Sequence, residues 1–154
     1  MLSSPHTLQL LIAVLSCLVA GAALFSIDFQ PAAAPIAIVT TTETLAAAGF
    51  ALSLPSGNGK AVINVSAQVT AGSSTSAIVL KVYRGATVTG APIGTFTNTI
   101  PLASGGPSFN LNAAISDVLQ SATQAQYCFS VTQTGATANG SITAASIQTE
   151  LLSG

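Results

Sequence analysis

Val62-Ile-Asn-Val-Ser-Ala-Gln-Val-Thr70 is the stretch that decides the fold of this 154-residue chain. Apolar side chains at every second position, from Ile63 to Val69, alternate with Asn, Ser, Gln and Thr. A period of two with one apolar face is typical of a half-buried β-strand. The sequence therefore predicts a strand with one face in a core and the other face polar and uncharged.

Similar segments precede and follow this strand, separated by turns rich in Gly, Ser and Pro. Further strands are predicted at 36–41, 50–54, 77–84, 93–100, around Phe109 and Leu111, at 126–132, and at 141–152 with a bulge near Ala144-Ala145. Within this strand-rich region, only residues 114–121 are predicted to be helical. Seven or eight short strands predict an all-β fold: a single jelly roll first, or an immunoglobulin-like β-sandwich second. Within it, Phe129 and Leu80 are expected to share one core.

The first 27 residues carry no charged side chain, and Leu8 to Phe25 is apolar except for Gln9 and Ser16. An 18-residue helix rises about 27 Å, close to the thickness of a bilayer's hydrocarbon core. We therefore predict an apolar helix over 1–26 that contacts a lipid membrane through residues 8–25. A Pro- and Ala-rich linker is expected at 27–35 and one β domain at 36–154.

The same N-terminal segment also fits a second interpretation, a cleaved secretory signal. Ala20-Gly21-Ala22 offers the small residues of a cleavage site, but the basic residues that open such signals are missing. A retained anchor is the first hypothesis and a cleaved signal the second. No Lys or Arg flanks the segment, so membrane orientation is not predicted.

Charged residues make up only 5% of the chain, against a usual ~25%. The net charge of −1 gives no basic patch, so no nucleic-acid partner is expected. A surface of Ser, Thr, Asn, Gln, Gly and Ala produces little repulsion between identical subunits. The composition therefore favours assembly of the chain with copies of itself.

The sequence offers no constellation of catalytic or metal-ligating residues. His6 is the only histidine, the four carboxylates lie far apart in the chain, and Cys17 and Cys128 form no CxxC pair and are not expected to bond to each other. We predict no catalytic, cofactor-binding or metal site, no cofactor and no enzymatic activity. Arg84, just before Gly85, is expected in solvent, with a carboxylate across a subunit boundary as the alternative.

Two short motifs invite functional interpretation. Ser56-Gly-Asn-Gly-Lys60 lacks the spacing of a phosphate-binding loop and is predicted to be a hairpin turn at Asn58-Gly59. Asn64-Val-Ser66 and Asn139-Gly-Ser141 match the glycosylation sequon, which occurs often by chance in a chain rich in Ser and Thr.

The segment Ala77-Ile-Val-Leu-Lys-Val-Tyr-Arg-Gly85, the run Ile93-Gly-Thr-Phe96 and the later run Gln126-Tyr-Cys-Phe-Ser-Val-Thr-Gln133 carry a resemblance. Over about residues 40–152 the chain resembles small single-jelly-roll proteins of virion capsids and spikes. The resemblance lies in the residue pattern of the strands: one strand ends in an Arg-Gly turn, and an aromatic strand and a closing strand follow late in the chain. It includes no diagnostic motif. It implies a non-enzymatic shell or spike component, and an apolar N-terminal helix would suit a virion that encloses a membrane.

These observations predict a non-enzymatic structural subunit that assembles with copies of itself, as a membrane-proximal capsid or spike component. Its expected location is the virion, in association with the membrane. Other capsid or filament proteins are further possible partners. The first alternative is a secreted subunit of an extracellular filament or surface layer, located outside the cell or at its surface. The second is a ligand- or carbohydrate-binding β-sandwich, for which two Tyr and no Trp leave few rings for stacking on sugars.

Overall fold

The computed structural model describes residues 24–39, 41–53, 59–72, 77–99, 108–120, 124–135 and 139–153. All of its regular elements in these ranges are β-strands. They are β1 (Leu24–Ile38), β2 (Thr44–Ala48), β3 (Leu52–Ser53), β4 (Gly59–Thr70), β5 (Ala77–Arg84), β6 (Gly94–Thr99), β7 (Ser108–Leu119), β8 (Gln124–Ala125), β9 (Tyr127–Thr134) and β10 (Gly140–Ser153).

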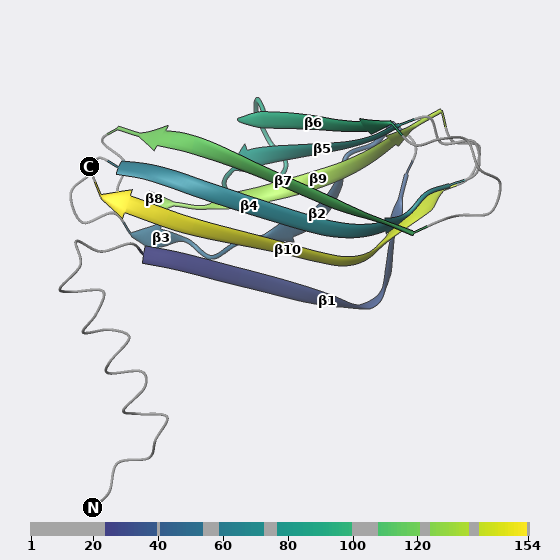
Figure 1. The fold of residues 1–154 in the computed structure, drawn as a ribbon, viewed down its shortest axis with the longest axis horizontal. Helices are drawn as coiled ribbons and strands as arrows, with labels where there is room; N and C mark the ends of the chain where they lie inside the picture. The colour runs from purple at the N-terminus through teal and green to yellow at the C-terminus, as the bar shows by residue number, and fades with distance from the viewer. Residues whose placement is uncertain are drawn as a thin grey trace, which may run out of the picture.

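The eight longer strands form two four-stranded antiparallel sheets that pack face to face (Figure 1). Sheet A has the order β1-β10-β4-β7, and sheet B has the order β2-β9-β5-β6. The short strands β3 and β8 pair separately. The prediction of an all-β, sandwich-like fold is confirmed, and the described residues hold ten strands where seven or eight were predicted.

The strand pairing is nested from the ends of the chain inward. β1 pairs with β10, β2 with β9, β3 with β8, β4 with β7 and β5 with β6. The chain therefore runs as one long folded hairpin, and apart from the separate β3–β8 pair its successive strand pairs fall alternately in sheet A and sheet B. Residues distant in sequence become neighbours, so one face of sheet A combines side chains from β4, β7 and β10.

The core lies between the two sheets. Phe129 and Leu80 are 0% and 1% exposed and belong to one continuous apolar cluster, which confirms the prediction for both. Ile63 and Ile147 from sheet A join the same cluster. The alternation along β4 is confirmed too, because its odd-numbered positions from 61 to 69 are buried and the others are not.

Buried polar atoms tie the sheets together at one end of β9. Gln133 is fully buried; its Nε2 donates to the backbone oxygen of Ile38 at 2.9 Å, and its Oε1 accepts from the backbone nitrogen of Gly140 at 3.1 Å. A Cβ on Gly140 would lie 2.3 Å from the backbone oxygen of Thr70, so only glycine fits there. The Gln133 amide thus joins the ends of β1, β9 and β10.

The N-terminal boundary of the domain differs from the prediction. Leu24 to Pro31 pair residue by residue with β10, whereas 24–26 were expected to end a helix and 27–35 to form a free linker. Extended backbone was correctly expected around Pro31 and Pro35, but the ladder partner on β10 is more than 100 residues away in sequence. Pro is tolerated because β1 is an edge strand, and the register shifts between Pro31 and Ile36.

The prediction of a helix at 114–121 is wrong. Residues 114–119 continue β7, which pairs with β4 over twelve consecutive residues. Cross-strand pairing overrides the helix propensity of Ala113 and Ala114. The predicted bulge in β10 is confirmed, because the register against β4 shifts between Ile142 and Ala144. The strand β2 was not predicted.

Residues 1–23, including His6, Cys17 and most of the predicted membrane segment, lie outside the described residues. Among the described residues there is no helix long and apolar enough to cross a membrane. Of the predicted membrane segment 8–25, Leu24 and Phe25 belong to the strand β1 instead.

Candidate functional site

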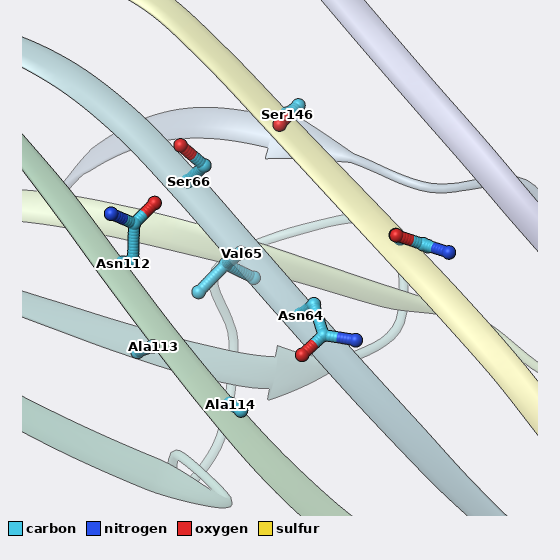
Figure 2. A pocket seen from close by; sticks show the side chains of 8 residues that line it. Asn64, Val65, Ser66, Asn112, Ala113, Ala114 and Ser146 are labelled. Carbon is cyan, nitrogen blue, oxygen red and sulfur yellow. The ribbon is translucent and has the colours of Figure 1, made fainter.

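The outer face of sheet A holds the most distinctive surface of the molecule. It is built from the outward-facing positions of β7, β4 and β10, which are partly or fully exposed. A shallow depression lies on it (Figure 2). The residues that line this depression are Asn64, Val65, Ser66, Asn112, Ala113, Ala114, Ser146 and Gln148.

The register explains why amides and hydroxyls gather there. Ser66 pairs with Asn112 on one side and with Ser146 on the other, and Figure 2 shows these three side chains in one row across the sheet. The next row consists of Ala114, Asn64 and Gln148. A second depression shares Ser66 and Ser146 and extends the surface along the strands.

This amide face, defined as the linings of the two depressions, carries no charged and no aromatic side chain. It therefore lacks an acid–base group, a nucleophile activated by a base, and a ring on which a sugar could stack. What it offers is a dense set of uncharged hydrogen-bond donors and acceptors at regular strand spacing. Such a face is suited to contact with another protein surface.

A polar cluster lies at the opposite end of β9 from Gln133. Arg84 on β5 donates to Asp117 on β7 through Nε at 2.6 Å and Nη2 at 2.5 Å, and the Tyr127 hydroxyl donates to the same carboxylate at 2.9 Å. Arg84 and Tyr127 belong to sheet B and Asp117 to sheet A. The cluster therefore fastens the two sheets at this end. Arg84 is exposed, as predicted, with 59% of its side chain accessible, but it also forms an ion pair that was not predicted, with a carboxylate of its own chain.

The electrostatics of this cluster follow from burial and hydrogen bonding. Burial of Asp117 acts to raise the pKa of its carboxyl, but the hydrogen bonds from Arg84 and Tyr127 outweigh it and leave the pKa below its usual value. Burial, followed by the hydrogen bond to Asp117, raises the pKa of Tyr127. All three groups keep their ordinary charge states at neutral pH, which fits a structural role.

A second cluster lies on the outer side of sheet B. Glu43 accepts a hydrogen bond from Lys81 and another from the Tyr83 hydroxyl at 2.5 Å. The hydrogen bonds from Lys81 and Tyr83 lower the pKa of Glu43. Burial and the hydrogen bond to Glu43 raise the pKa of Tyr83 to about 12. Sequence reasoning missed this cluster, since 38 residues separate Glu43 from Lys81.

Cys128 lies near this second cluster, in the ladder position opposite Tyr83. Its thiol is free and fully buried, and burial raises its pKa to about 11. A buried thiol with a raised pKa is a poor nucleophile at neutral pH. Nothing among these groups forms a catalytic arrangement.

No site residues were predicted from sequence, and the described residues contain no group of three or more metal-ligating side chains. Of the two sequon asparagines, Asn64 lies on the amide face and Asn139 is exposed just before β10. The predicted turn at Asn58-Gly59 falls largely outside the described residues, and Gly59 begins β4.

No family model matches the chain, and no curated protein is similar to it in sequence.

We expect Asp117→Asn to lower the free energy of unfolding by about 1–2 kcal/mol at pH 7. A charged hydrogen-bonded pair contributes about 1.5–3 kcal/mol, and the exposure of the Arg84 side chain, 59%, reduces that value. Because the folded-state pKa of Asp117 is lowered, its contribution is complete above the unfolded-state value near 3.8 and is lost as pH falls further.

Urea titrations of wild type and Asp117→Asn from pH 7 down to pH 2 measure this effect. The difference between the two proteins should disappear at the acid end. Glu150→Gln removes a carboxylate outside the cluster and should behave as wild type. A constant difference at every pH would exclude the proposed charge pair as its source.

Proposed function

We propose that this protein is a non-enzymatic structural subunit that assembles with copies of itself, as a membrane-proximal capsid or spike component of a virion. The observation that carries the proposal is the middle of sheet A without an unpaired charge, which consists of the amide face and the neighbouring edge strand β7, whose one charged side chain, Asp117, is paired with Arg84. A face of this kind satisfies its hydrogen-bonding groups against another uncharged protein surface without burying a charge.

The distribution of the few charges supports self-assembly. Glu43 pairs with Lys81 and Asp117 pairs with Arg84. Among the remaining charged side chains that the structure describes, Lys60 and Glu150 lie toward one end of sheet A and outside the amide face. Identical subunits therefore meet with little like-charge repulsion.

The nested strand pairing supports the virion assignment. Strands paired from the outside of the chain inward, with the pairs split between two four-stranded sheets, are the arrangement expected of a jelly roll. Jelly rolls occur in viral capsid proteins, and also in lectins and cupins. An amide face without aromatic rings argues against a sugar-binding role, and the lack of a described metal-ligand group argues against a cupin-like centre.

A second candidate is a secreted subunit of an extracellular filament or surface layer, and one observation favours it. Cleavage after Ala22, at the small-residue site, would leave Ala23 directly before the first residue of β1, Leu24. The intact mass of native protein separates the two candidates, since it shows whether residues 1–22 are retained. Both candidates require self-assembly.

We expect the full chain to associate to the same extent from about 0.1 M to about 1 M salt. Uncharged contacts are not screened, whereas ion-paired interfaces weaken as the Debye length falls from about 10 to 3 Å. Light scattering of the full chain in a non-ionic detergent, at constant protein concentration across the salt series, measures this. If the extent of association fell steeply as salt was added, an uncharged interface would be contradicted.

A further inference from the structure

The two sheets end in four edge strands, and these differ in how well they could accept another strand. The ladder of β1 is interrupted between Pro31 and Ile36, and that of β2 between Leu45 and Ala47. β6 is only six residues long. β7, in contrast, pairs with β4 over twelve residues without a register shift. The outer backbone of such an edge is a template for a further strand.

The side chains of β7 lack the devices that usually protect an edge. Natural edge strands carry Lys, Pro or bulges that prevent pairing with another chain. β7 contains no Lys, Arg or Pro, and its only charged residue, Asp117, is 7% exposed and bound by Arg84. Val118, an apolar side chain, is 64% exposed on the same strand.

The opening of the sandwich beside β7 is also apolar. Phe109, Ala113 and Ile115 of β7 are only partly buried, and so is Phe96 of β6; all four pack against the core. β6 and β7 lie close together there, since a Cβ on Gly94 would be 2.3 Å from Cδ1 of Ile115. A strand added to β7 would cover apolar surface and pair its outer backbone as far as Val118, whose oxygen already accepts a 3.3 Å hydrogen bond from Nη2 of Arg84.

The charge distribution at this edge favours a second copy of the same chain as the strand that pairs with β7. A two-fold interface places a surface patch against the same patch of another copy, so every free charge near the axis meets its own like charge. The edge formed by β6 and β7 has no such free charge among its described residues. A second copy of this chain therefore fits without an electrostatic penalty.

We propose that β7 pairs antiparallel with β7 of a second copy, about a two-fold axis near Ala113 and Ala114, and joins the two A sheets into one of eight strands. This inference rests on the proposed self-assembly and names its surface. In this arrangement Asn112 of one copy lies opposite or diagonal to Ser116 of the other, at about 5–8 Å.

The test compares two double variants of the full chain in the same non-ionic detergent. Asn112→Lys with Ser116→Lys puts two positive charges on β7, where they meet their own copies across the axis. Ser146→Lys with Gln148→Lys adds the same charge to the same face of sheet A, but on β10. We expect the first to weaken self-association about tenfold or more, and the second to change it less than about twofold, by sedimentation.

Equal weakening by both double variants would place the interface on the amide face and overturn the edge pairing, while self-assembly would stand. No weakening by either would also overturn it. A wild-type chain that never associates would overturn the proposed function and this inference together.

Hydrogen exchange on the wild type avoids any question of misfolded variants. Amides in residues 108–119 should gain protection as protein concentration rises, and those in residues 94–99 should gain less. Protection of 108–119 that does not depend on concentration would overturn the proposal.

Discussion

A chain that begins at Ile36 should unfold far more easily than one that begins at Leu24. The shorter chain loses the eight backbone pairs from Leu24–Leu151 to Pro31–Ala144. At about 0.5–1.5 kcal/mol for each ladder hydrogen bond, the loss should reach about 4 kcal/mol or more. It also leaves β10 as a new unprotected edge, so the shorter chain should aggregate. Urea titration of both chains, monitored by circular dichroism, measures the difference.

The chain that begins at Leu24 serves as the control, because it removes only residues that precede β1. It should match the full chain in stability. If the chains beginning at Leu24 and Ile36 were equally stable, residues 24–35 would be a spacer after all, and the domain boundary predicted from sequence would be restored.

Phe129→Ala should lower the free energy of unfolding by about 3–5 kcal/mol, because a fully buried ring leaves a cavity between the sheets. Phe129 pairs with Val82 on β5 and with Ala47 on β2, so no solvent-exposed neighbour can move in to fill the space. Denaturant titration at neutral pH measures the loss.

Phe50→Ala is the matched control, since the Phe50 side chain is 67% exposed and its truncation leaves no cavity. Its cost should stay within about 0.5 kcal/mol of wild type. Similar losses from the two substitutions would mean that the core does not lie where the strand alternation places it.

The alternating strands could be predicted from sequence because one buried face imposes a period of two. This holds for β4 and for most of β5, where Ile78, Leu80 and Val82 are buried as expected and Tyr83 is the one buried residue of the opposite face. β9 is different, because Cys128 and Ser130 on its second face are buried as well. Alternation alone does not show that both faces of a strand are covered.

Local pattern failed where a distant partner decides the structure. Ala114 and its neighbours favour a helix locally, yet pairing with β4 extends them. Pro31 and Pro35 indicate a linker, yet the β10 ladder turns that segment into an edge strand. Arg84 and Asp117 are 33 residues apart in the chain, so no local motif predicts their ion pair. In each case the missing information was the nested topology.

The amide face shows the same limit. Asn64, Ser66 and Gln68 were recognised as the polar side of one strand. Their continuation into Asn112 of β7 and Ser146 of β10 depends on the register of three strands, which the sequence does not display. Composition predicted that an uncharged surface exists, and the fold determines where it is continuous.

Sedimentation equilibrium of the full chain, in a density-matched non-ionic detergent over a wide range of protein concentration, tests the central claim most directly. A self-assembling subunit should show a protein mass that rises with concentration through multiples of 15.2 kDa. A mass that stays at 15.2 kDa at every concentration would contradict the account.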